Sequence, residues 1–185
     1  YAQEPTQQEN TEQEKPKEEY QDDFRKTSLL EATIYTGLPA LTITAAVFTG
    51  LNLKEKKSAN DVLDGVAWGF KNPPVWDKNP WYVNYVGHPY VGSEAYLLAR
   101  NRNHSPFVSF LYSTLESVTW EYAIEPWVGA RPSKQDLLLT STAGSLLGEL
   151  RYQGKKALMK NEDSTLNKIG IILLDPIDAL YKAFE

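Results

Sequence analysis

The sequence predicts an all-α protein, in which a bundle of four to six mostly apolar helices follows a disordered acidic leader. Three observations predict this class. Proline and capping residues mark the ends of several helices, apolar residues recur at helical spacing, and no segment shows sustained strand alternation. The 185 residues, 42% of them hydrophobic, are enough for one domain with its own core. We therefore expect a single helical domain over residues 27–185, interrupted by an ordered loop rich in proline and aromatic residues.

Composition excludes several classes of protein. The chain has 24 acidic and 19 basic side chains and a net charge of -5, which argues against nucleic acid as a partner. The absence of cysteine excludes a disulfide scaffold, a thiolate zinc site and a cysteine nucleophile. Five tryptophans and eleven tyrosines are typical of an aromatic core or of an aromatic belt at a membrane interface.

The first 26 residues differ from the rest of the chain. They contain eight acidic and four basic side chains and very few apolar ones. Such a segment cannot bury enough apolar surface to offset the entropy lost on ordering, so we expect residues 1–26 to be disordered. The opening Tyr-Ala-Gln-Glu is compatible with a signal peptide removed by cleavage, which would indicate an exported protein.

A long uncharged stretch comes next, within a predicted helix at about 28–53. Thr33 to Leu53 contains 21 residues without a charge, enough to cross a hydrocarbon layer of about 30 Å. Five threonines and Pro39 weaken that possibility. Three alternatives remain open at this point: a helix buried in the bundle, a membrane span, and an interfacial or re-entrant helix.

The stretch from Asn72 to Tyr90 contains four prolines, two tryptophans and three tyrosines. Prolines at this density prevent a continuous helix, so we expect an ordered loop. One interpretation is a stiff connection pinned to the bundle by Trp76 and Trp81. The other is an aromatic collar in a lipid headgroup region.

Four more helices are predicted after the loop, at about 89–101, 105–125, 133–160 and 169–184. Pro89 is tolerated in the first turn of its helix, and Ser105 followed by Pro106 is a start signal for the next. In the third, Ser133 and Asp136 have the spacing of a capping box, with Asp136 reaching back to Ser133. Asp175-Pro176 interrupts the last segment and starts a final amphipathic helix.

A polar stripe follows the helix predicted at 105–125. Its members are spaced so that they fall within about 100° of arc on an otherwise apolar helix, which indicates that they face the interior or a water-filled cavity. They are Ser109, Ser113, Glu116, Ser117 and Trp120. Together with polar residues of the neighbouring helices they predict a polar centre, made of His88, Glu94, Arg100, Glu116, Ser117, Trp120, Glu121, Glu125 and Glu149.

Three interpretations of this polar centre compete. In the first it is structural, and arginines pair with its carboxylates. In the second it is a carboxylate-rich metal site, but neither His88 nor His104 has an acidic residue three positions earlier, so we predict no metal ligands and no cofactor. In the third, His88 acts in acid–base catalysis with Glu121 or Glu125. These three residues are the catalytic candidates, and none is assigned, because the chain has no known catalytic motif.

Residues from about Trp68 to Tyr152 resemble the bacterial domain of unknown function 3943 family, with a weaker echo in LLDPIDALY. The motifs NPWYVNYVGHPYVGSEAYLLARNR, SFLYSTLESVTWEY and PSKQDLLLTSTAGSLLGELRY carry the resemblance. The series that is specific as a whole is His88-Pro89, Gly92, Arg100, Ser117, Trp120-Glu121, Glu125, Pro132-Ser133, Asp136, Thr140, Gly144 and Gly148-Glu149.

The resemblance implies a location rather than a reaction. It implies an exported protein of the Gram-negative cell envelope, facing the periplasm and associated with the outer membrane. Longer members continue into what resembles an outer-membrane β-barrel, so the implied partner is membrane lipid or a separate outer-membrane barrel protein. We expect a structural or interaction role for a membrane-associated helical domain. The alternatives are a membrane-associated hydrolase acting on a lipid or cell-wall precursor, and a binding module for a small amphiphile.

Overall fold

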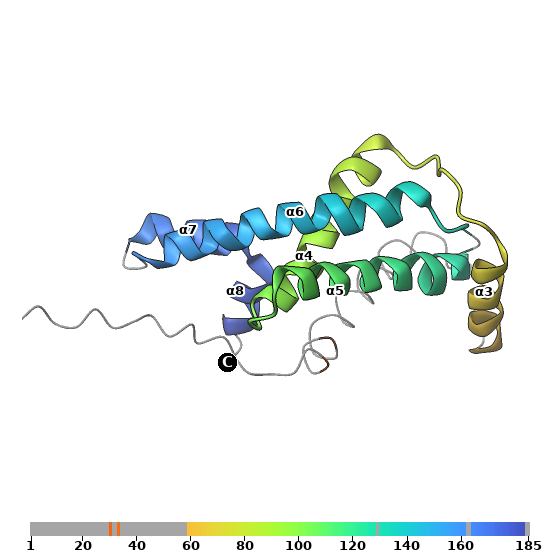
Figure 1. The fold of residues 1–185 in the computed structure, drawn as a ribbon, viewed down its shortest axis with the longest axis horizontal. Helices are drawn as coiled ribbons and strands as arrows, with labels where there is room; N and C mark the ends of the chain where they lie inside the picture. Colours follow the sequence, from red (N-terminus) through yellow and green to blue (C-terminus); the bar gives the residue numbers. More distant parts are fainter. Residues whose placement is uncertain (1–29, 31–32, 34–58, 129, 162–163, 184–185) are drawn as a thin grey trace, which may run out of the picture.

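The computed structural model describes residues 30, 33, 59–128, 130–161 and 164–183, and all regular elements within these ranges are helical (Figure 1). The predicted all-α class is therefore confirmed. The leader predicted at 1–26 lies outside the described residues, and so does the helix predicted at 28–53, apart from Leu30 and Thr33. The alternatives for Thr33 to Leu53 stay open.

Helices α4, α5 and α6 form the centre of the structure, and the other helices lie at its two ends. Helices α4, α5 and α6 pack against one another, α3 packs on the segment that follows α5, and α7 packs along α6 (Figure 1). The α-helices of the described residues are α3 (Ala59–Lys71), α4 (His88–Arg100), α5 (Pro106–Thr119), α6 (Lys134–Met159), α7 (Thr165–Leu174) and α8 (Pro176–Ala183). A π-helix, η2 (Val83–Gly87), precedes α4; a second π-helix, η3 (Trp120–Ile124), and a 3₁₀-helix, η4 (Glu125–Val128), follow α5.

The predicted capping signals place the helix starts correctly. The hydroxyl of Ser105 accepts a hydrogen bond from the amide of Val108 at 3.3 Å, at the start of α5. The hydroxyl of Ser133 accepts one from the amide of Asp136 at 3.2 Å, at the start of α6. The segment predicted at 169–184 is two helices, α7 and α8, separated at Asp175.

Three details differ from the prediction. Helix α3 was not predicted, and it is stabilised by distant contacts such as the stacking of Phe70 on Tyr122 at 4.9 Å between ring centroids. The loop predicted at Asn72–Tyr90 becomes helical from Trp81, because Pro80 stands just before the first turn, where its missing amide is tolerated. The side chains of Trp76 and Trp81 are 63% and 70% exposed, so the interpretation that they pin this segment to the bundle is wrong.

Glycines allow the backbones of α4 and α6 to touch. A Cβ atom on Gly92 would lie 2.0 Å from the carbonyl oxygen of Thr140, and one on Gly144 would lie 2.8 Å from the Cα of Gly92. Helix α5 packs against both α4 and α6, and the hydroxyl of Ser113 on α5 donates a hydrogen bond to the carbonyl of Gly92 at 2.9 Å. Such close packing through small residues is common in helices that associate without a large hydrophobic driving force.

The interior of the described bundle is rich in polar side chains. The predicted interior position of the stripe on α5 is confirmed for Ser109, Ser113 and Ser117, which are buried, while Glu116 and Trp120 are half-buried. Among the described residues, the buried hydrophobic side chains are Tyr96, Leu97, Ala99, Tyr112 and Tyr152.

Large apolar side chains lie outside instead. On α5, α6 and α7 the exposed ones are Phe107, Leu111, Leu115, Leu138, Leu146, Leu150, Leu166, Ile169, Ile172 and Leu173. On α5 and α6, whose buried residues are mostly polar, the usual distribution of polar and apolar residues is therefore reversed. Among the helices of the described ranges, none combines the length and the hydrophobicity that crossing a membrane requires.

The contact between α4 and α6 leads to the first prediction. We expect Gly92→Ala to lower the free energy of unfolding by about 3 kcal/mol, because the new methyl group meets backbone atoms that cannot turn away. Chemical denaturation followed by circular dichroism measures this change.

Gly87→Ala is the matched control. A Cβ atom on Gly87 would have 3.7 Å to its nearest neighbour, the carbonyl oxygen of Tyr82. We expect this change to be neutral or to stabilise by about 0.5–1 kcal/mol, because alanine loses less backbone entropy on folding. Equal effects of the two substitutions would contradict the close contact.

Candidate functional site

Three titratable side chains from distant parts of the chain meet where α4, η3 and α6 come together. His88 is the first residue of α4, Glu121 the second of η3, and Asp136 the third of α6. One nitrogen or oxygen atom of each lies within 4.8 Å of the corresponding atoms of the other two. We call these three residues the acid–histidine cluster. Two of the predicted catalytic candidates, His88 and Glu121, belong to it.

Glu121 is held by the start of α6. Its carboxylate accepts a hydrogen bond of 2.6 Å from the backbone amide of Ser133. In a capping box this amide would bond to the carboxylate three residues later. Ser133 does cap the helix at the amide of Asp136, but the second bond of the predicted box goes to Glu121 rather than to Asp136. Neither carboxylate oxygen of Asp136 forms a hydrogen bond of normal geometry with the described residues, although Ser133 and Asp77 lie close enough to shift its pKa.

The imidazole of His88 lies between a hydroxyl and a carboxylate. Its Nδ1 is 3.3 Å from the hydroxyl oxygen of Thr140, and its Nε2 is 3.4 Å from a carboxylate oxygen of Asp136. The side chain of His88 is 16% exposed, whereas Asp136 is 0% and Glu121 is 1% exposed. The cluster is therefore almost closed to solvent.

Two further carboxylates lie near the cluster. Asp77 precedes η2, and side-chain amides hold it: Asn84 and Gln135 each donate to its Oδ1 at 2.6 Å, and Asn79 donates to its Oδ2 at 2.8 Å. Glu125, the third catalytic candidate, accepts a hydrogen bond of 3.3 Å from the indole of Trp120. Negative charge from both residues acts on the cluster.

Burial and crowding of like charges shift the pKa values here. Burial, followed by the charge of Glu125, raises the pKa of Glu121 to about 9. Burial and the nearby Asp77 raise the pKa of Asp136 to about 8, and the same two causes raise that of Glu125 to about 7. Burial lowers the pKa of His88, although Asp77 acts in the opposite direction. Without a compensating cation, the neutral forms of these groups are favoured.

Other members of the predicted polar centre lie in a separate network of ion pairs. The guanidinium of Arg100 bonds to the carboxylate of Glu149 at 2.8 Å, and the hydroxyl of Tyr96 donates to the same carboxylate at 2.7 Å. Glu94 pairs with Arg151 at 2.6 Å. These pairs match the structural interpretation, in which arginines neutralise carboxylates within the bundle. The predicted centre is thus divided, and Glu94, Arg100 and Glu149 lie in this network rather than in the cluster.

The remaining members of the predicted centre lie on α5 and η3. Ser117 is buried, and its hydroxyl has no hydrogen-bond partner among the described residues. Burial raises the pKa of Glu116, and a hydrogen bond with Tyr112 acts against that shift. Trp120 connects the end of α5 to Glu125.

A third polar group, which the sequence analysis missed, joins α6 to the last two helices. The ammonium of Lys155, only 1% exposed, pairs with Asp175 at 2.7 Å and with Asp178 at 2.8 Å, and donates to Asn101 at 3.1 Å. Lys155 follows Gly144, Gly148 and Arg151 at helical spacing, and that pattern was the available signal.

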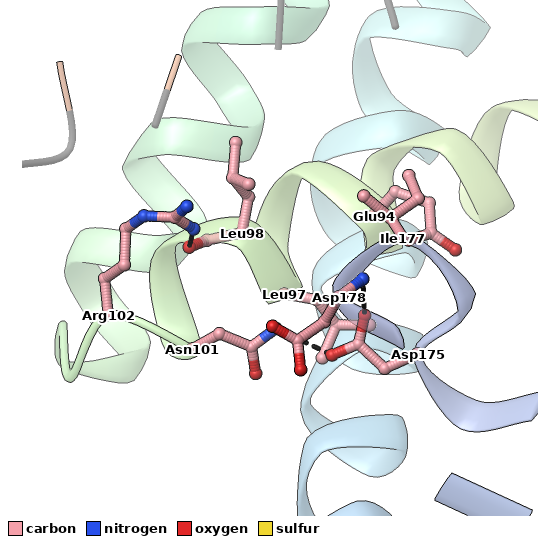
Figure 2. A pocket seen from close by; sticks show the side chains of 8 residues that line it. All are labelled: Glu94, Leu97, Leu98, Asn101, Arg102, Asp175, Ile177 and Asp178. Atoms are coloured by element: carbon pink, nitrogen blue, oxygen red, sulfur yellow. Dashed lines mark hydrogen bonds between the residues drawn. The ribbon is translucent and has the colours of Figure 1, made fainter. Parts of the chain in front are cut away.

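A small cavity of about 20 Å³ opens beside this group, enough for about one water molecule. Figure 2 shows side chains of α4, of the turn after it and of α8 converging there, with Asn101 bonded to Asp175, the residue between α7 and α8. The lining residues are Glu94, Leu97, Leu98, Asn101, Arg102, Asp175, Ile177 and Asp178.

The ion-pair network predicts an acid-dependent stability. Burial raises the pKa of Glu149, but hydrogen bonds from Arg100, Tyr96 and Gln153 outweigh it and lower the pKa to about 2, against 4.5 for an ordinary glutamate. Because the folded-state pKa is lowered, the stabilisation is complete above pH 4.5 and disappears as the pH falls towards 2.

We therefore expect Glu149→Gln to destabilise the protein by about 1 kcal/mol at pH 7, after allowance for partial solvent screening. The difference from wild type should shrink between pH 4.5 and pH 2 in denaturation measurements. Asp64→Asn, on the exposed surface of α3, is the control and should change the unfolding free energy by less than about 0.5 kcal/mol. If the difference in unfolding free energy between wild type and Glu149→Gln stays constant over this pH range, the proposed role of the network is excluded.

Comparison with known proteins supports the resemblance seen in the sequence. Residues 73–177 match the family model described as a domain of unknown function (DUF3943). No curated protein and no solved structure is significantly similar to the chain. The match runs from the segment before η2 into α8, so it includes all three residues of the acid–histidine cluster. Since it covers more than half of the sequence, the chain belongs to the DUF3943 family.

Proposed function

We propose that this protein is a membrane-associated helical domain of the Gram-negative cell envelope, with a structural or interaction role. It contacts lipid through the apolar outward faces of α5 and α6. The observation that carries the proposal is the reversed distribution of side chains, in which serines, charged residues and glycines lie inside and leucines lie outside.

The outward faces of the two helices are regular and uncharged. On α5, Phe107, Leu111 and Leu115 follow one another at intervals of four residues and are 67%, 47% and 60% exposed. On α6, Leu138, Leu146 and Leu150 repeat at multiples of four residues and are 57%, 66% and 65% exposed, with Thr142 between them. At about 1.5 Å per residue the row on α6 spans about 18 Å and the row on α5 about 12 Å, so the longer row extends over most of one lipid leaflet.

Lipid is favoured as the occupant because these side chains form long apolar rows rather than a small patch within a polar rim. Exposed apolar surface of this extent is costly in water, and it marks a contact with a membrane or another protein. The segment before α4 adds exposed aromatic side chains, among them Trp76, Trp81, Tyr82 and Tyr85. Tryptophan and tyrosine favour the boundary between water and lipid, which supports the predicted aromatic collar.

The two alternative functions receive less support from the geometry. A hydrolase would act through His88 with Glu121, but Glu121 is 1% exposed, so a lipid or cell-wall precursor has no direct access to it. A binding module for an amphiphile needs a cavity of several hundred cubic ångströms, and the cavity that the described residues form beside Asp175 has about 20 Å³.

Vesicle flotation tests the proposal. We expect the full chain to float with phosphatidylethanolamine–phosphatidylglycerol vesicles. The double variant Leu138→Glu with Leu146→Glu should have a partition coefficient for these vesicles more than tenfold lower than that of wild type. Each leucine contributes about 1.5–3 kcal/mol when fully buried in an apolar phase, and each new charge adds a desolvation penalty.

Asn161→Glu is the control, because it adds a charge at an exposed position in the turn after α6. It should leave flotation unchanged, and all three proteins should have similar circular dichroism spectra. A wild-type chain that remains in the dense fraction would contradict lipid binding, whether it is a monomer or covers its apolar faces by self-association.

A further inference from the structure

We propose that the acid–histidine cluster binds one divalent metal ion of the zinc type. The ligands are Nε2 of His88 and one carboxylate oxygen each from Glu121 and Asp136. This proposal does not depend on the lipid contact, because the cluster lies inside the bundle and the lipid-facing residues lie outside it.

Asp136 provides the main evidence for a ligand. Its side chain is 0% exposed, and neither carboxylate oxygen forms a hydrogen bond of normal geometry with the described residues, although Asp77 and Ser133 lie close enough to shift its pKa in opposite directions. Leaving a buried carboxylate without partners costs several kcal/mol, so native proteins rarely do so without a function. Nε2 of His88, a nitrogen that can carry positive charge or bind a metal, lies 3.4 Å from one of these oxygens.

The spacing of the atoms suits a metal ion better than a hydrogen bond. Ligand atoms about 2.1 Å from a tetrahedral zinc ion lie about 3.4 Å from one another. The separation between His88 and Asp136 is 3.4 Å, longer than the usual hydrogen bond between nitrogen and oxygen. Glu121 contributes an oxygen within 4.8 Å of the other two ligand atoms, so a modest side-chain movement completes the site.

The outer contacts orient two of the ligands. Thr140 lies 3.3 Å from Nδ1 of His88, on the opposite side of the ring from Asp136. When Nδ1–H donates to this hydroxyl, the lone pair of Nε2 points towards the carboxylates, which is the tautomer that binds metal. The amide of Ser133 fixes one oxygen of Glu121 at 2.6 Å and so orients this carboxylate.

The charge around the cluster also favours a cation. Within the described part of the chain, neither Glu121 nor Asp136 forms an ion pair with lysine or arginine. Asp77 adds negative charge, but its two oxygens are already bonded to three side-chain amides, so it is not needed as a ligand. A mixed set of one imidazole and two carboxylates is suited to Zn²⁺ and related divalent ions.

A metal at this position would connect three segments that are far apart in the sequence: the start of α4, the π-helix η3 and the start of α6. Two of its three ligands are fully buried, so the ion would act mainly on stability. A ligand that binds only the folded state raises the melting temperature in proportion to the logarithm of its concentration.

The test uses the purified full chain, stripped with chelator and titrated with Zn²⁺ by calorimetry and thermal melting. We expect saturation at one ion per chain and a rise in melting temperature. His88→Gln and Asp136→Asn should each weaken Zn²⁺ binding at least tenfold. The matched control is His104→Gln, because His104 is the only other histidine in the chain, and it should bind Zn²⁺ as wild type does.

Two further measurements decide the result if a variant does not fold. Cobalt substituted into the wild-type protein should show an X-ray absorption spectrum with one imidazole among oxygen ligands. Thr140→Val keeps the ligands and should still weaken Zn²⁺ binding, because it removes the orienting hydroxyl. The proposal is wrong if the wild type shows no saturable binding, if the cobalt shell lacks imidazole, or if His104→Gln loses as much affinity as His88→Gln.

Discussion

The close contact between the backbones of α4 and α6 is the constraint on which the rest of the structure depends. At Gly92 and Gly144 the two helices are too near to accommodate any side chain, so the register between them is fixed. With that register, His88 faces Asp136 and Thr140, and Arg100 faces Glu149. A shift of one helical turn would separate all of these partners at once.

The same contact explains why polar groups occupy the interior. Helices that approach through glycine and serine leave little room for large apolar side chains between them, and the polar groups that remain must bond to one another. Arg100, Arg151 and Lys155 each find a carboxylate along this seam. Glu121 and Asp136 of the acid–histidine cluster differ from the carboxylates of this seam, because neither forms an ion pair with lysine or arginine among the described residues.

Local signals in the sequence predicted the positions of most helices. They did not predict which polar residues would bond to one another. Ser105 and Ser133 predicted where their helices begin, because a cap depends only on neighbouring residues. The spacing of the serines on α5 alone predicted which face of that helix is buried. Glu121 bonds to Ser133, and Lys155 to Asp175, through contacts that depend on the three-dimensional register. The π-helical turn after Thr119 likewise had no local signal, and α3 is held by stacking and by the contact of Gly69 with Pro126.

Along α6, polar residues face inward and apolar residues face outward. Because the chain has no cysteine, single cysteines placed along this helix test it directly in detergent solution with a small uncharged thiol reagent. Cysteines replacing Leu146 or Leu150 should react at least tenfold faster than those replacing Ser141 or Ser145. Faster reaction at the serine positions than at the leucine positions would contradict the structure described for this helix.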